Sequence, residues 1–193
     1  MNSGGPEAVL EFWFRRDEAT GELLAMKQWF SKDPEFDDAV RRTFGDLMQD
    51  ARAGSLDWRD SPRASLAQIV VLDQFFRNAW RDTPEAFAGD SQALRLADAL
   101  VSCGGDATLE PLERVFAYLP FEHAESPAEQ DRSVALFESL LRHGPQFKPY
   151  LDFAIRHREV IRRFGRFPHR NRILGRPSSA QESHYLAQPG SGF

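Results

Sequence analysis

The chain is poor in cysteine, in lysine and in long apolar runs. It has 193 residues and one cysteine, Cys103, which excludes an internal disulfide and is typical of a reducing compartment. No apolar run approaches the roughly 20 residues that are needed to cross a bilayer. The first residues lack the charged-then-apolar pattern of a secretory signal. We therefore expect a cytoplasmic protein that does not associate with membranes.

Strand signals are also scarce, whereas helix-start signals recur. A side chain that can accept a hydrogen bond precedes a proline, which suits the first helical position, at Asp33, Ser61, Thr83 and Ser126. Two positions also have the spacing of a capping box, namely Ser126 with Glu129 and Ser179 with Glu182.

Apolar periodicity predicts about eight helices. We expect them over residues 6–16, 34–53, 62–80, 84–103, 110–119, 127–142, 146–164 and 179–187, with an additional short piece near 23–30. Because the links are short, neighbouring helices should be antiparallel. The sequence therefore predicts an all-α array or bundle of helical hairpins, in one domain over residues 1–188 with a flexible tail over 189–193.

Positive charge is carried almost entirely by arginine, with 21 arginines against three lysines. Residues 156–176 hold eight arginines and one glutamate, a net charge of +7, which leaves −12 for the rest of a chain whose total is −5. Two glycines and a proline exclude a continuous helix through residues 162–176, which we call the basic loop. The guanidinium fork suits carboxylates and phosphates, and the acidic remainder argues against nucleic acid as a partner.

The predicted helix 62–80 carries a charge on its apolar face. Asp73 falls on a stripe that otherwise consists of Leu66, Ile69, Val70, Phe76 and Trp80. A carboxylate on a core face is costly unless it is paired, and Arg77 lies four residues further on the same face. With Asn78, these residues form either an internal salt bridge that orients helices or the wall of a pocket.

A second polar cluster follows the predicted helix 110–119. Because Pro120 should end that helix, Glu122, His123 and Glu125 should form a loop. Two carboxylates beside an imidazole suit a divalent metal, or a general base with an orienting carboxylate, or the neutralisation of arginines in the basic loop. The paired-histidine spacing of a zincin helix is missing, and we expect neither a metal nor a cofactor.

Two further polar side chains interrupt apolar faces. His157 shares its face with Tyr150, Phe153, Ile161 and Phe164, and Gln130 precedes the apolar stripe of the helix 127–142. A single buried histidine is ordinary, but Asp73, His123, Gln130 and His157 together predict a common polar region in the interior.

Four motifs, in the same order, carry a family resemblance. They are Val-Leu-Glu-Phe-Trp-Phe at 9–14, Leu-Asp-Gln-Phe-Phe-Arg-Asn at 72–78, Tyr-Leu-Pro-Phe-Glu-His-Ala-Glu at 118–125, and Arg-Phe-Gly-Arg-Phe-Pro-His-Arg-Asn at 163–171 with Ile-Leu-Gly-Arg at 173–176. The chain resembles the bacterial domain-of-unknown-function family numbered 924 over almost its whole length. The resemblance implies an all-helical fold similar to tetratricopeptide-repeat (TPR) arrays and assigns no catalytic residue.

The residues leave three functional hypotheses open. In the first, a polar interior pocket binds a small anionic ligand or a peptide carboxylate. Its ligand-binding residues would be Asp73, Arg77, Asn78, Glu122, Gln130, Arg166, His169, Arg170, Asn171 and Arg172.

The second hypothesis is a metal-independent hydrolase or transferase. His123 or His157 would act as general base, oriented by Glu122, Glu125 or Asp73, while an arginine stabilises developing negative charge. The third is a purely structural ion network in a protein-interaction scaffold. Exposed TPR-like faces would also permit a homo-oligomer.

Overall fold

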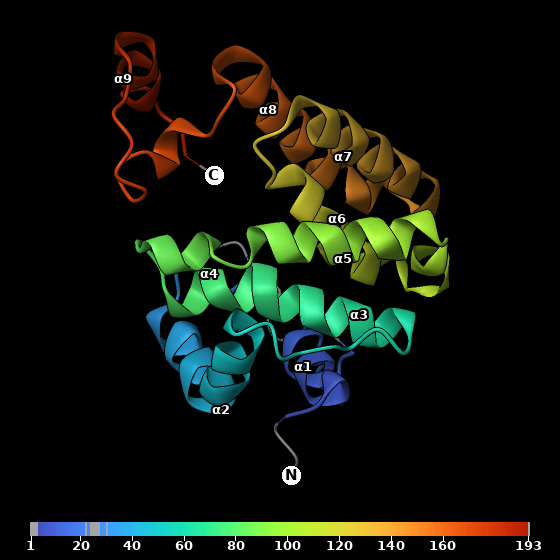
Figure 1. Cartoon of the computed structure of the whole chain (residues 1–193). Helices are drawn as coiled ribbons and strands as arrows, with labels where there is room; N and C mark the ends of the chain where they lie inside the picture. Colours follow the sequence, from blue (N-terminus) through green and yellow to red (C-terminus); the bar gives the residue numbers. More distant parts are fainter. Residues whose placement is uncertain (1–3, 22, 24–27, 30, 193) are drawn as a thin grey trace. The chain divides into compact units, whose positions relative to one another are not determined.

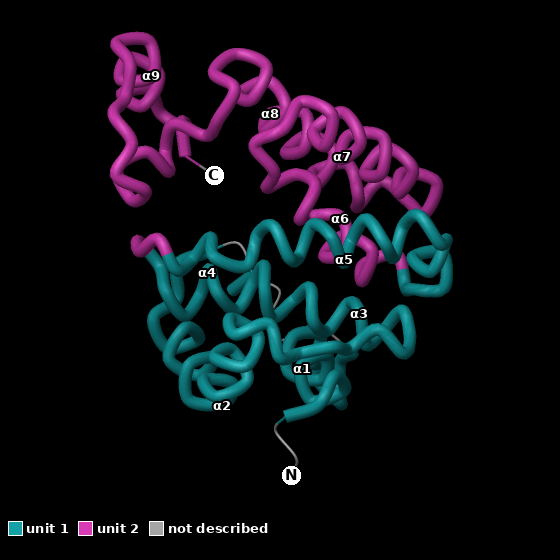
Figure 2. The backbone as a smooth tube through the Cα atoms, in the orientation of Figure 1, with its two compact units in different colours: residues 1–81, 85–110 teal, residues 82–84, 111–193 magenta. Residues whose placement is uncertain are grey.

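The computed structural model describes residues 4–21, 23, 28–29 and 31–192. The chain forms two compact units (Figure 2). Unit 1 consists of Met1–Arg81 and Glu85–Glu110, and unit 2 consists of Asp82–Pro84 and Pro111–Phe193. The prediction of a single domain over residues 1–188 stays a prediction.

Helices make up both units, and the described ranges contain no strand apart from an isolated bridge between Arg16 and Leu23. Unit 1 holds α1 (Pro6–Trp13), α2 (Pro34–Arg52), α3 (Pro62–Ile69), a π-helical turn (Val70–Phe75), α4 (Phe76–Ala79) and α5 (Asp90–Ser102) (Figure 1). Unit 2 holds α6 (Pro111–Glu122), α7 (Pro127–Leu140), α8 (Lys148–Phe164) and α9 (Ala180–Leu186). The all-α prediction is confirmed.

Short 3₁₀ turns supplement these helices, at Pro84–Phe87, Gly105–Thr108, Leu141–His143, Pro145–Phe147 and Pro168–Arg170. The predicted helical piece near 23–30 lies largely outside the described residues. The isolated bridge at Arg16 explains why α1 ends at Trp13 rather than at residue 16, because the main chain of Arg16 pairs with Leu23 instead of continuing the helix.

Aromatic rings fill the core of unit 1. Phe44 lies 4.8 Å from Phe75 and 5.1 Å from Phe12 between ring centroids, and Trp13 lies 5.6 Å from Phe75. The stretch from Ala64 to Phe76 is buried on every side. The sequence predicted a single apolar stripe there, which is wrong, because this helix runs through the middle of its unit.

The chain between α3 and α4 widens into the π-helical turn, so the N–H of Phe76 reaches back five residues to the carbonyl of Val71. Gly89 packs closely against this turn, since a Cβ on Gly89 would lie 2.3 Å from the carbonyl oxygen of Leu72. The turn therefore fixes the start of α5, which begins at Asp90.

In unit 2, α7 packs against both α6 and α8. Tyr118 of α6 meets Phe137 of α7 with ring centroids 5.9 Å apart. Further along the chain, Ile161 and Phe167 pack into a second apolar cluster in which Phe167 is fully buried. Through Phe167, this cluster packs the basic loop against the last turns of α8.

Helix ends largely follow their predicted signals. The side chains of Asp33 and Ser61 accept backbone hydrogen bonds at the starts of α2 and α3. Ser179 and Glu182 form the predicted capping box of α9, whereas Ser126 makes no side-chain capping bond, so its predicted capping box is wrong.

The prediction that Pro120 ends its helix is also wrong. Pro120 lies inside α6, which runs to Glu122, and the amide of His123 still donates to the carbonyl of Leu119 at 2.9 Å. Proline removes one helical hydrogen bond, but Pro120, Phe121 and Glu122 are all buried, and this packing outweighs the loss. As a result, Glu122 is a helical residue rather than a loop residue.

Candidate functional site

The predicted pair of Asp73 and Arg77 is confirmed in unit 1. Asp73 is completely buried, and Nη1 of Arg77 lies 3.0 Å from its Oδ1 and 2.9 Å from Oδ1 of Asp90. Gln74 donates to the other oxygen of Asp73 at 2.5 Å. Burial acts to lower the pKa of Arg77, but Asp73 and Asp90 together raise it above its ordinary value. The guanidinium is therefore held in its charged form between two carboxylates.

Asn78 belongs to a second buried network that the sequence analysis missed. Its Nδ2 donates to Oδ1 of Asp37 at 2.7 Å, and Arg81 binds the same carboxylate with two nitrogens, at 2.5 and 3.0 Å. Asp37 precedes Val40 and Phe44 at helical spacing, so it interrupts an apolar stripe just as Asp73 does. That interruption is the signal that could have identified it.

His157 and Glu122 form a buried pair in unit 2, with exposed fractions of 5% and 4%. Nδ1 of His157, on α8, lies 3.1 Å from Oε1 of Glu122, at the end of α6. The same nitrogen lies 2.9 Å from the carbonyl oxygen of Phe153, one turn earlier in α8. Because a carbonyl oxygen only accepts hydrogen bonds, Nδ1 must carry the proton in the neutral ring.

Groups that can carry a positive charge surround His157. Burial lowers the pKa of His157 well below its ordinary value, and charges on His123, Arg170 and His169 lower it further. The ring of His123 lies 6.3 Å from that of His157. The ring centroid of Phe167 lies 5.5 Å from that of His157 and 5.6 Å from that of His169. The guanidinium carbon of Arg170 lies 4.6 Å from the same Phe167 centroid. Three of these residues, His157, His169 and Arg170, surround Phe167, and His123 lies beside His157; we call the four the imidazole–arginine cluster.

Gln130 links this cluster to α7. Its Nε2 donates to the carbonyl oxygens of Glu122, at 2.6 Å, and Ala124, at 2.8 Å, and so satisfies main-chain acceptors at the end of α6. Its Oε1 and the hydroxyl of Ser133, three residues further along α7, are buried without a hydrogen-bond partner among the described residues. Both residues have an exposed fraction of 0%. Ser133 was not singled out by sequence, because serine on a helix is unremarkable.

Glu125 holds the basic loop in place. Arg176 binds both of its oxygens, at 2.6 and 2.9 Å, and the amide of Phe167 donates to it at 2.8 Å. Burial acts to raise the pKa of Glu125, but these donors and the nearby charge of Arg170 lower it overall. The predicted neutralisation of loop arginines by this motif is seen here, and the carboxylate positions Phe167 and Arg170 rather than contacting His157.

Arg166 is bound in a similar way by Glu182 of α9. Two nitrogens of the guanidinium lie 2.6 and 2.9 Å from the carboxylate oxygens. Hydrogen bonds from Arg166 and from the Ser179 amide lower the pKa of Glu182 to about 2. The sequence identified Glu182 as a capping residue and missed that it also binds the loop.

Asn171 and Arg172 complete the loop without entering the cluster. Asn171 is buried, donates to the Ser178 hydroxyl at 3.0 Å and accepts from Nε of Arg176 at 3.0 Å, so it braces the loop internally. Arg172 is exposed. Of the predicted site residues, the cluster and its immediate neighbours thus bring together Glu122, His123, Gln130, His157, His169 and Arg170, whereas Asp73, Arg77 and Asn78 belong to unit 1.

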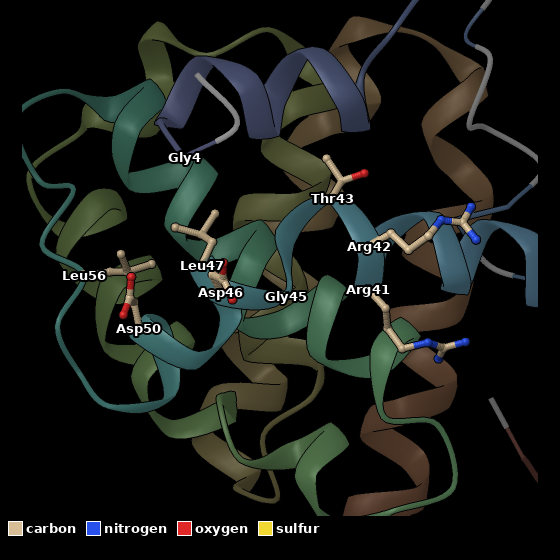
Figure 3. Close-up of a pocket in the computed structure, with 9 residues that line it drawn as sticks. All are labelled: Gly4, Arg41, Arg42, Thr43, Gly45, Asp46, Leu47, Asp50 and Leu56. Atoms are coloured by element: carbon tan, nitrogen blue, oxygen red, sulfur yellow. The ribbon is translucent and has the colours of Figure 1, made fainter. Parts of the chain in front are cut away.

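A depression of about 310 Å³ lies along α2 in unit 1 (Figure 3). Its walls mix both signs of charge, with Arg41 and Arg42 on one side and Asp46 and Asp50 on the other. None of the predicted site residues lines it.

Two searches of the described residues bear on the kind of site. No group of three or more histidine, cysteine, aspartate or glutamate side chains there is arranged to hold a metal ion. Within the same residues, no helix combines the length and apolar character that crossing a membrane requires.

Comparisons with known proteins place the chain in a family. Residues 9–190 match the model of the family described as "Bacterial protein of unknown function (DUF924)". The chain is also similar to the solved structure of a protein of unknown function from Agrobacterium tumefaciens, with 38% identity and a TM-score of 0.81 over 94% of this chain and 96% of that one. A comparison with curated proteins found no match. The chain therefore belongs to the DUF924 family of bacterial proteins.

Proposed function

We propose that unit 2 binds a small anionic ligand, a carboxylate or a phosphate, at the imidazole–arginine cluster. The observation that supports this proposal best is that His157, His169 and the Arg170 guanidinium surround Phe167, while His123 lies beside His157. Arg170 is positively charged, and an imidazole takes up a proton more readily beside an anion, so this combination of groups suits an anionic ligand.

The remaining arginines of the loop have a different role. Arg166 and Arg176 bind Glu182 and Glu125 through two hydrogen bonds each, so their forks are used to fix the loop. The guanidinium of Arg170 stacks on Phe167, and this side chain is 6% exposed. A fork held in this way suits bidentate recognition of a carboxylate or phosphate.

A second candidate, a metal-independent hydrolase or transferase, is favoured by the pair of His157 and Glu122. The carboxylate and the Phe153 carbonyl hold the Nδ1 proton, so Nε2 is the basic nitrogen, as a general base requires. A bound anion would be the substrate in that case. Turnover assays should therefore use whichever ligand binds first.

We also infer the setting of this site from coarser features. The single cysteine favours a reducing, cytoplasmic environment. The packing of consecutive helices α6, α7 and α8 is consistent with a TPR-like hairpin array, whose faces also suit peptides that end in a carboxylate.

A thermal-shift screen tests the proposal. Phosphate, sulfate, acetate and glycolate are added to the wild type, to Arg170→Ala and to Arg172→Ala, whose side chain is exposed on the same loop. A ligand at 100 times its Kd stabilises by about 2.7 kcal/mol, which raises Tm by about 5–10 °C for a chain of this size. We expect this rise in the wild type and in Arg172→Ala, and its loss in Arg170→Ala.

Two results would overturn the proposal. One is the absence of a shift with any of the anions in the wild type, and the other is an equal shift in Arg170→Ala. Should Arg170→Ala fail to fold, Arg170→Lys keeps the charge and removes the fork, and the proposal then requires a reduced shift.

A further inference from the structure

Gly45 lies between the basic wall and the acidic wall of the depression along α2 (Figure 3). Glycine inside a helix is destabilising relative to alanine. Neither the backbone nor the packing requires it here, because α2 is continuous from Pro34 to Arg52 and a Cβ on Gly45 would meet no atom within 4 Å. A residue that breaks a local rule without a structural reason points to a function. Here the missing side chain keeps the depression open.

Three charged groups of the depression are available to a ligand. Arg41 is already held by an ion pair and by a main-chain carbonyl. The side chains of Arg42 on the same wall, and of Asp46 and Asp50 on the other wall, make no hydrogen bond or ion pair with the described residues. Because a helix rises 1.5 Å per residue, the two carboxylates lie about 6 Å and about 12 Å from Arg42 along the axis.

Apolar side chains and a fixed loop complete the depression. Leu47 and Leu56 line it, and Leu47 is buried. The carbonyl of Leu56 accepts a hydrogen bond at 2.8 Å from Nε2 of Gln68, a buried residue of α3, whose Oε1 accepts from the amide of Trp58 at 2.8 Å. These bonds hold the loop after α2 against α3. The depression is therefore formed without a ligand, as small-molecule sites usually are.

We propose that this depression binds a small dipolar chain, with its carboxylate against Arg42 and its ammonium group against Asp46 and Asp50. Two available carboxylates face one available guanidinium, so a ligand must bring a positive charge as well as a negative one. The separation along α2 requires that the two charges lie at opposite ends of an extended molecule. A short peptide with free ends and an ω-amino acid share this chemistry. The depression lies in unit 1, so the inference does not depend on the function proposed for unit 2.

Amide NMR titrations of the whole chain both measure and locate this binding. The probes are triglycine and 6-aminohexanoate, and each has analogues that lack one charged end: N-acetyltriglycine and triglycine amide for the first, hexanoate and hexylamine for the second. We expect saturable shifts of the amides between Arg42 and Asp50 with at least one probe. Each of its analogues should bind at least about 5-fold more weakly, the factor that corresponds to an ion pair of about 1 kcal/mol.

The probe that binds more tightly identifies the source of the ligand as a peptide or as an ω-amino acid. Two results overturn the inference. One is the absence of saturable shifts in this part of α2 with both probes. The other is an affinity for the analogues that equals the affinity for the probe, since the charged ends would then contribute nothing.

Three variants connect the binding to the depression. Gly45→Leu fills it with a good helix former and should abolish the shifts without lowering Tm. Arg42→Gln and Asp46→Asn should each weaken binding of the probe about 5-fold. Arg52→Gln is the control, because it removes an exposed arginine of the same helix outside the depression. Unchanged binding in Gly45→Leu, or an equal loss in the control, contradicts the inference. Should Gly45→Leu melt below the wild type, unchanged binding in both charge variants contradicts it instead.

Discussion

The buried polar groups of unit 1 and unit 2 differ in how their charges are balanced. In unit 1, Arg77 lies between Asp73 and Asp90, so the carboxylates neutralise the guanidinium. In unit 2, His157, His169 and Arg170 surround Phe167, and the buried carboxylate of Glu122 contacts His157. Similar interruptions of an apolar pattern therefore have two outcomes. In unit 1 the polar groups form ion pairs that join helices, whereas in unit 2 we propose that they also bind a ligand.

The largest effect is expected from breaking the balance in unit 1. Asp73→Ala leaves Arg77 buried beside a single carboxylate and should reduce the free energy of unfolding by about 3–5 kcal/mol. Urea denaturation of the variant and the wild type measures this difference in the free energy of unfolding. Asp38→Ala removes an exposed partner of Arg41 and should leave the free energy of unfolding nearly unchanged. Equal stability of Asp73→Ala and wild type would show that the buried pair does not stabilise unit 1.

The next largest effect concerns how the π-helical turn positions Asp90. A Cβ on Gly89 would lie 2.3 Å from the Leu72 carbonyl oxygen, so Gly89→Ala must displace the start of α5. We expect a loss of about 1–3 kcal/mol in chemical denaturation.

The control for this substitution is Gly45→Ala within α2. A Cβ there meets no atom within 4 Å, and the change should stabilise the protein by up to about 1 kcal/mol. If both variants change stability in the same direction, the close approach of Gly89 has no energetic consequence.

Unit 2 also contains a balanced pair, Arg166 with Glu182, and its contribution should depend on pH. The pKa of Glu182 is lowered to about 2 from an ordinary value of 4.5. A lowered carboxyl pKa means that the unfolded state binds the proton more readily, so the stabilisation is complete above pH 4.5 and is lost as pH falls toward 2. Glu182→Gln should cost about 1–2 kcal/mol at pH 7 and should flatten this acid-dependent part of the profile.

Arg166→Gln tests whether the pair is the cause. It should flatten the same pH window, and the double variant should be little less stable than either single one. Additive losses in the double variant would mean that the two side chains act independently.

The smallest expected effect distinguishes the cluster of unit 2. Because the pKa of His157 is lowered below 6.5, the unfolded state takes up the proton first, and stability falls as pH decreases from 6.5. One group changes the free energy of unfolding by at most about 1.4 kcal/mol per pH unit. Thermal melts between pH 7.5 and 5.5 should show this fall in the wild type and in His143→Gln, whose histidine is exposed, and not in His157→Gln. A fall of equal size in His157→Gln would assign it to another group.

Local signals predicted the helices and several polar contacts correctly. Asp73 was identified because it interrupts an apolar stripe, and Arg77 because it follows at i+4 on the same face. Asp90, the other partner of Arg77, could not be predicted, since its position depends on the π-helical turn and on the close approach of Gly89. Pro120 shows the same limit, because buried packing keeps it inside α6 against its local preference.

The polar contacts of unit 2 were predicted in part. His157 and Gln130 were recognised as polar residues on apolar faces, and the basic loop as a place where arginines need partners. Tertiary packing determines which of those arginines pair with a carboxylate. Arg166 binds Glu182 on α9, and Arg176 binds Glu125 beyond the end of α6. Because these partners lie far apart along the chain, the sequence pattern could not predict which arginine binds which carboxylate.

Nitrogen NMR of the imidazole rings tests the central claim most directly. The chain has five histidines, and His157→Gln assigns the resonances of His157. We predict that His157 is neutral at pH 7 with its proton on Nδ1, and that an anion which raises Tm in the thermal-shift screen also shifts the ring nitrogen resonances of His157. A proton on Nε2, or a charged ring at this pH, would contradict the account.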